Sequence, residues 1–363
     1  MKPHPPGLAW PALLALAGAW LACGSEPPPL PVREVSLLSD SYSVDRIYRS
    51  MTGPASVRRF SFDRQGPPRL VWITGYRAEI VGPDQKAMSP EFMCHSNLDF
   101  TDGQEHADLV RDGNRTVRRL FTASQGQMEV EFPEGYGIPV LTNERFDLTT
   151  QVLNLNDQEG SFDVRHETTL QFVLDQEAGR QMKPLYQFAL QSMVLLEGPD
   201  GFPATPEGTG HGTSCAVGEA AMGETPIGDD FGRKFAAHWV VEPGRHVYHT
   251  PVTKMVKIPA ASTTVHFIAV HLHPFAESLE LRDWTTGETV FRSRARNREQ
   301  AIGLRHVDSF SSEAGLALYS DHGYELIATY DNTSGEPQDS MAVMYLYAAD
   351  PIFQNPLETT QGS

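Results

Sequence analysis

Short runs of β-forming residues, separated by turn residues, recur along most of the chain. In RLVWITGYRAEIV (residues 69–81) and similar runs, apolar side chains alternate or cluster between Gly, Pro and Asn. Alternation with a period of two indicates strands, and many short strands joined by turns are typical of antiparallel sandwiches. Long stretches with helical periodicity are absent, and NREQAIGL (residues 297–304) is the one short helix expected. The pattern predicts an all-β protein.

The strand-like runs form two series with a different composition between them. Residues 196–232 are rich in Gly, Pro and Thr and almost without strand signals, which is typical of an interdomain loop. We therefore expect two tandem antiparallel β-sandwiches, jelly-roll-like, at residues 35–195 and 233–353, with a tail at 354–363.

The first residues have the layout of a bacterial export signal. A short apolar run follows Lys2 and ends in WLACGS, which resembles a lipobox with Cys23 as the lipidated residue. The expectation is a signal peptide at residues 1–22, a Pro-rich tether at 23–34, and a membrane-anchored lipoprotein facing the periplasm or the cell exterior. The alternative is ordinary signal cleavage nearby, with Cys23 removed.

Composition narrows the range of partners. The 363 residues carry a formal net charge of −17, which argues against nucleic acid and against an anionic membrane surface. Membrane contact is expected through the lipid anchor only. Phosphate-binding Gly-rich loops, nucleophile elbows and HExxH helices are absent from the sequence, so hydrolase and nucleotide-binding functions lack support.

Two histidines, His271 and His273, stand one residue apart at the end of the apolar run HFIAVHLH. Residues i and i+2 of a strand project from the same face, so both imidazoles point the same way. Paired imidazoles suit copper or zinc. A pair of solvated histidines on the polar face of a strand would have the same spacing.

Export leaves Cys94 and Cys215 as the other cysteines. In an oxidising compartment they most simply form one disulfide. Because His95 and His211 lie beside them, a Cys2His2 metal site is the alternative.

The segment HWVVEPGRHVYHTPVTKMVKIPAASTTVHFIAVHLHPFAESLELRD (residues 238–283) and then YELIATYDNTSGEPQDSMAVMYLY (324–347) resemble the copper type II, ascorbate-dependent monooxygenases. This is the family of peptidylglycine α-hydroxylating and dopamine β-monooxygenase. The resemblance implies one copper held by His271, His273 and Met341, with Tyr345 near substrate. Met344 is the alternative ligand, and a strand would place it on the face opposite Met341.

The first half resembles the family's other domain through FMCHSNLDF (92–100) and EVEFPEGYGIPVLTNERFDLTTQVLN (129–154). The family's electron-storing copper uses three histidines, where this chain has Cys94, His95 and Leu153. A second metal near His95 would therefore keep one of its three ligands. Gln151 matches a polar residue of the family's first domain and, with Tyr345, is a candidate catalytic residue. Ala269 replaces the arginine that binds a peptide carboxylate, which argues against amidation of glycine-extended peptides.

The expected function is a copper-dependent, monooxygenase-like oxidoreductase. It would activate dioxygen at one copper, attack a small-molecule or peptide substrate that the sequence leaves unidentified, and take electrons from an external reductant such as ascorbate. The alternative is an exported copper-binding protein for storage, sensing or delivery. A third possibility is an interaction module without metal.

Overall fold

The computed structural model describes Met1 and residues 29–109, 118–156, 160–179, 181–195, 227–228 and 234–358. Cys23, His211 and Cys215 lie outside these residues, as do nearly all of the expected signal peptide and most of the loop at 196–232. In the described part, no helix is long and apolar enough to cross a membrane.

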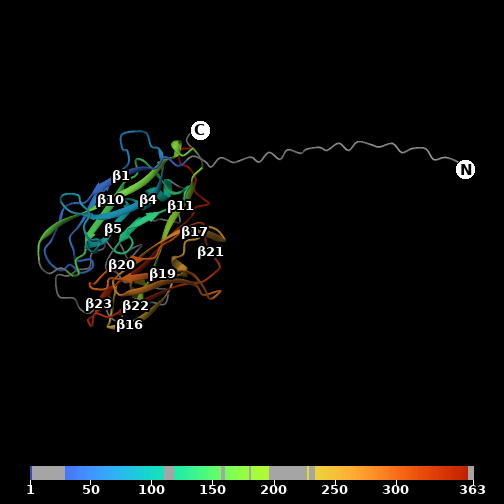
Figure 1. Cartoon of the computed structure of the whole chain (residues 1–363). Helices are drawn as coiled ribbons and strands as arrows, with labels where there is room; N and C mark the ends of the chain where they lie inside the picture. The colour runs from blue at the N-terminus through green and yellow to red at the C-terminus, as the bar shows by residue number, and fades with distance from the viewer. Residues whose placement is uncertain are drawn as a thin grey trace.

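The chain is almost entirely β-structure, as its pattern predicts (Figure 1). The strands of the first half are β1 (Arg33–Leu38), β2 (Tyr42–Val44), β3 (Ala55–Phe60), β4 (Leu70–Val81), β5 (Met93–Phe100), β6 (Arg119–Ser124), β7 (Glu129–Glu131), β8 (Tyr136–Leu141), β9 (Phe146–Val152) and β10 (Phe162–Leu174). Those that follow are β11 (Lys183–Gln191), β12 (Val194–Leu195), β13 (Ile227–Gly228), β14 (Lys234–Ala236), β15 (Trp239–Val241), β16 (Gly244–Pro251), β17 (Ser262–Leu272), β18 (Ala276–Asp283), β19 (Glu288–Asn297), β20 (Leu304–Val307), β21 (Phe310–Tyr319), β22 (Tyr324–Asn332), β23 (Gln338–Ser340) and β24 (Ala342–Ala349).

The expected helix at residues 297–304 is wrong. Asn297 ends β19, Leu304 begins β20, and the residues between them form bends. The helical elements that the structure describes are α1 (Gly103–Leu109) and short 3₁₀ turns at Pro90–Phe92, Asp175–Glu177 and Thr253–Met255. Apolar residues inside a turn between paired strands gave a misleading helical signal here.

Two sandwiches are present, and one sheet runs through both. In the first, β1, β10, β4 and β8 face the sheet β3-β9-β5-β6. In the second, β11, β24, β17 and β21 face the sheet β16-β22-β18-β19-β20. β8 and β11 pair in parallel over two residue pairs, so the inner sheets join into one ten-stranded sheet.

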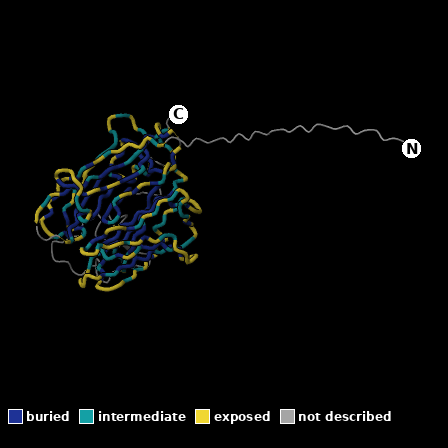
Figure 2. Tube along the Cα trace, in the orientation of Figure 1, coloured by how far each residue is buried: buried dark blue, intermediate teal, exposed yellow. Residues whose placement is uncertain are grey.

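The central strands β17 and β24 are buried on both faces. Figure 2 shows that buried residues occupy the interior of the described part. Met344 and Val270 face the core of the second sandwich, while Met341 and Val343 face the core of the first. A strand covered on both sides needs apolar residues at successive positions. This explains why FIAV and AVMYLY are continuous apolar runs with little alternation.

The first sandwich also buries polar side chains between its sheets. Ser96 on β5 shares hydrogen bonds with Tyr76 on β4 (2.7 Å) and Thr168 on β10 (2.9 Å). Beside them lies His166, whose ring meets Tyr42 edge-on at 5.8 Å and whose two ring nitrogens are buried without a hydrogen-bond partner. Burial, and then the nearby His95, lower the pKa of His166 to about 3.

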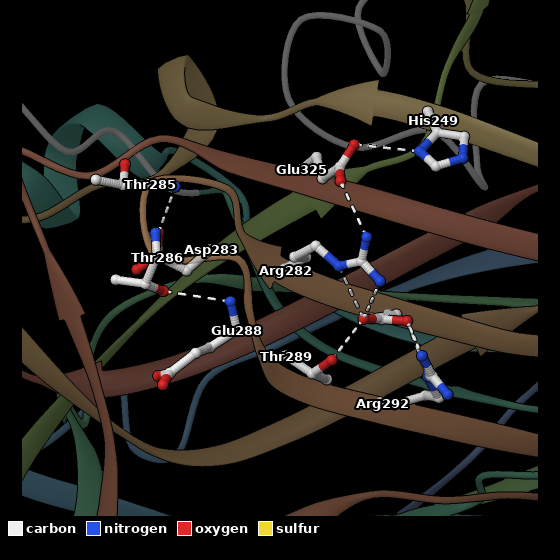
Figure 3. Close-up of polar contacts among 10 residues, drawn as sticks. His249, Arg282, Asp283, Thr285, Thr286, Glu288, Thr289, Arg292 and Glu325 are labelled. Carbon is white, nitrogen blue, oxygen red and sulfur yellow. Dashed lines mark hydrogen bonds and ion pairs between the residues drawn. The ribbon is translucent and has the colours of Figure 1, made fainter.

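A charged network covers the outer face of the second sandwich (Figure 3). The buried carboxylate of Glu280 accepts hydrogen bonds from Thr289 at 2.6 Å and from Arg292, and it forms an ion pair with Arg282 at 3.2 Å. Although burial raises the pKa of Glu280, the bonds from Thr289 and Arg292 bring it below its usual value. Through Thr289 and Arg292, these side-chain bonds link β19 to the neighbouring strand β18.

We expect His166 to make stability depend on pH. The folded chain keeps this imidazole neutral, whereas the unfolded chain takes up a proton near pH 6.5, so stability is greatest above that pH and falls as pH decreases toward 3. Between pH 7 and 5 the loss is about 2 kcal/mol. Urea unfolding at both pH values measures it. His166→Leu should remove this part of the loss, and an unchanged pH dependence in the variant would contradict the assignment.

Glu280→Gln should lower the free energy of unfolding by about 1–3 kcal/mol at neutral pH, because two arginines lose a buried anionic partner. The exposed Glu288, at the start of β19, offers the control Glu288→Gln, which should change little. Because the pKa of Glu280 is lowered on folding, the difference between wild type and Glu280→Gln should shrink as pH falls below about 4.5. Equal unfolding curves for both variants at pH 7 would refute the role of the network.

Candidate metal site between the two sandwiches

The two predicted histidines lie where β17 ends and the following turn begins. His271 is the next-to-last residue of β17 and lies opposite Val343 of β24, on the face that meets the first sandwich. Pro274, which has no amide hydrogen, follows His273 and ends the ladder. Phe275 then adopts a left-handed conformation with φ 68°, and its N–H donates to Asn297 Oδ1 at 2.7 Å. The tight turn holds His273 at the rim of the strand.

His271 is a buried imidazole with unsatisfied nitrogens. It is 5% exposed, and neither Nδ1 nor Nε2 has a hydrogen-bond partner. Its ring stands perpendicular to that of His273 at a centroid distance of 5.2 Å. Burial, and then the nearby imidazoles of His273, His95 and His238, hold the pKa of His271 well below its ordinary value. The ring is therefore neutral, which is the form that binds a metal.

His273 has partners for both ring nitrogens. Nδ1 lies 3.3 Å from the backbone oxygen of Asp339 and 3.7 Å from its carboxylate, and Nε2 lies 3.5 Å from Ser50 Oγ. Burial lowers the pKa of His273, but the contacts with Asp339 raise it overall. A proton on Nδ1, donated to Asp339, leaves the lone pair of Nε2 facing Ser50. Metal-binding histidines are commonly oriented through their other nitrogen in this way.

Met341 directly precedes β24, the strand that pairs with β17. The register pairs His271 with Val343 and Leu272 with Ala342, so Met341 comes opposite His273 as the ladder ends. Its side chain is fully buried in the same core as Val343, whereas Met344 belongs to the other core. The expectation that the two methionines point to opposite faces is confirmed, and the face of Met341 is that of the histidines.

The two histidines open onto a pocket of about 550 Å³, part of it open solvent, between the halves. Cys94 and Leu153 enter it from the first half, and both are buried. The lining residues are Arg49, Ser50, Met93, Cys94, Gln125, Leu153, Leu155, His271, Leu272, His273, Pro274, Phe275, Ile302, Gln338 and Asp339. Cys94 and Leu153 of the first half thus share a pocket with the paired histidines of the second.

Hydrogen bonds between the halves fix the walls of this pocket. Gln125 Oε1 accepts from the N–H of Leu304, and Gln127 Oε1 accepts from the N–H of Val270, both at 2.6 Å. The amide of Asn156 exchanges two bonds with the backbone of Ile302, at 2.9 and 2.8 Å. The pocket is therefore part of an interface that hydrogen bonds hold together.

The other predicted site residues lie around the pocket without lining it. His95 is buried on β5, close enough to His271 to affect its pKa. Gln151 on β9 donates through its side-chain amide to the backbone oxygen of Gly53 at 2.9 Å. Tyr345 is buried in the first core and pairs across the strands with Ala269. His271, His273 and Cys94 thus line one pocket, and Met341 lies on the chain segment next to it.

Three polar residues near the histidines were not predicted as site residues. Asp339 belongs to β23, which pairs with β15. Its place two residues before Met341 is a signal that could have been used. Ser50 comes from a turn far away in sequence, and the ring of His238 lies 6.0 Å from that of His273.

The donors fit a soft or borderline metal ion. In the described part of the chain, no three His, Cys, Asp or Glu side chains are gathered in a way that could hold a metal. A site of two imidazoles and one thioether requires only two such side chains. The unsatisfied nitrogens of His271, the oriented ring of His273 and the buried sulfur of Met341 match the donors that copper accepts.

No family model matches the chain, and no curated protein matches it significantly. Among solved structures, PNGase F, a glycosylasparaginase from Flavobacterium meningosepticum, is 7% identical over 88% of this chain and 96% of its own, with a TM-score of 0.34. The STIV MCP, from Sulfolobus turreted icosahedral virus, is 8% identical over 88% and 97%, with a TM-score of 0.30. Scores this low support no argument about activity.

Proposed function

We propose that this chain is a copper-dependent, monooxygenase-like oxidoreductase that holds one copper ion through His271, His273 and Met341. The observation that carries the proposal is the imidazole of His271, buried with both nitrogens unsatisfied beside a second imidazole. Leaving a buried polar group unpaired costs about 1–3 kcal/mol. A metal bond to one of these nitrogens would offset that cost.

The surrounding residues would perform distinct tasks. The backbone oxygen of Asp339 orients His273 and keeps the proton on Nδ1. Met341 supplies a soft donor, which favours the reduced ion. Copper, when bound, would supply dioxygen activation and electron transfer. The pocket would admit a small substrate, and Ala269, on β17, offers no cation for a substrate carboxylate.

An external donor would supply electrons in this proposal. At the positions where the resembling family binds its second copper, Cys94 and Leu153 both line the pocket of the first site. They leave His95 as the one histidine of that set. A reductant such as ascorbate, or a partner protein, would therefore deliver electrons from outside.

A copper-binding protein without turnover is the second candidate. The observation that favours it is the enclosure of the histidines: both are 5% exposed, and the first half covers them through Ser50 and Leu153. A site for storage or delivery needs retention of the ion more than access for substrate. In both cases, export and a lipid anchor at Cys23 remain part of the proposal.

Purified protein should bind about one copper per chain, and His271→Ala or His273→Ala should abolish it, because each removes one of the two strong donors. Equilibrium dialysis followed by metal analysis gives the stoichiometry. His306→Ala is the control, since this exposed histidine pairs with Asp308 on the surface. Equal copper in all four proteins would remove the basis of the site.

Met341→Leu should weaken Cu(I) binding at least about tenfold and leave Cu(II) binding nearly unchanged, because a thioether matters most to the softer ion. Leucine nearly conserves volume, so the core should tolerate it. Oxygen consumption by copper-loaded protein with ascorbate should be measurable in wild type and mostly lost in this variant. Met344→Leu, in the opposite core, is the matched control. Copper binding without any oxygen consumption by the wild type would favour the binding protein.

A further inference from the structure

We propose that Cys94 is a ligand of the same metal, so that the site is a two-histidine, one-cysteine, one-methionine centre shared by both sandwiches. The inference rests on the proposed copper site at His271, His273 and Met341. It adds a donor from the first half, and it changes the kind of copper centre that the protein forms.

A β-bulge directs Cys94 toward the histidines. On β5, Met93 pairs with Val152 of β9, and the next pair is His95 with Gln151. Cys94 is therefore the extra residue of this strand. Bulges re-aim a side chain that the regular pleat would send elsewhere. Here the bulge coincides with a thiol that lines the pocket of His271 and His273.

The opposite wall of the pocket supplies an independent observation. His271 lines it with both ring nitrogens buried and unsatisfied. Ring and thiol thus come from strands of different halves, and both residues are buried where they line the pocket. Met341 and Cys94 also belong to one apolar core. The first half also lines the pocket with apolar Met93, Leu153 and Leu155 and with polar Arg49, Ser50 and Gln125.

The donor set determines the chemistry. Two imidazoles, one thiolate and a weak thioether are the ligands of copper centres that transfer single electrons. On binding, the thiol releases one proton and its sulfur forms a bond to the ion. In the described structure no three of the His and Cys donors converge, so binding must draw Cys94 and the imidazoles together.

Spectroscopy of the reduced, copper-free protein loaded with one equivalent of Cu(II) tests this ligand. We expect an intense visible sulfur-to-copper charge-transfer band and a narrow parallel hyperfine splitting in the electron paramagnetic resonance spectrum. Co(II), which does not oxidise thiols, should give a thiolate charge-transfer band in the near ultraviolet. Cys94→Ser and Cys94→Ala should abolish both bands and still bind copper through the histidines and Met341. Thermal unfolding checks that the variants fold, and Cys94→Ala keeps a small apolar side chain.

Cys215→Ser is the matched control, and it should retain both bands. Copper binding with neither band in the wild type would overturn the role of Cys94 and leave the proposed function intact. A Cys94–Cys215 disulfide found by mass spectrometry of the exported protein would overturn it as well. If the wild type binds no more copper than His273→Ala, both the proposed function and the role of Cys94 fail.

Discussion

The antiparallel pairing of β17 with β24 is the constraint on which the rest of the structure depends. It joins two segments about seventy residues apart along the chain and fixes which side chains share a face. Because a shift of one residue would exchange the two faces, two cores of different shape hold the register. The first core takes Met341 and Val343, and the second takes Val270 and Met344. That register determines where His271 and His273 lie.

The pocket exists because the two sandwiches are tied together along the inner sheet and through side-chain amides. Gln125, Gln127 and Asn156 each bond to backbone of the second half, so they hold the wall opposite the histidines. Residues of both halves line the pocket, Cys94 and Leu153 from the first and His271 and His273 from the second. The shape of the pocket therefore depends on how the halves meet.

The fold class and the same-face histidines could be predicted from the sequence, because the period-two pattern and the i, i+2 rule are local. The opposite directions of Met341 and Met344 followed from the same rule. Long-range features had no such signal. The bulge at Cys94 depends on pairing with β9, and Asp339 reaches His273 only because β23 pairs with β15. The helix expected at residues 297–304 was wrong, and within that turn the backbone N–H of Ile302 donates to Asn156 of the first half.

The position of β11 bears on what a fragment of this protein could do. β11 hydrogen-bonds to β24 over seven residue pairs, from Leu185 to Gln191, although it precedes the loop at 196–232. A fragment that begins after that loop would expose one edge of β24, whose residues are almost all apolar. Unpaired apolar edges are templates for intermolecular pairing. A stable second sandwich therefore has to include residues 183–191 as well as the residues 233–353 that the sequence pattern assigns to it.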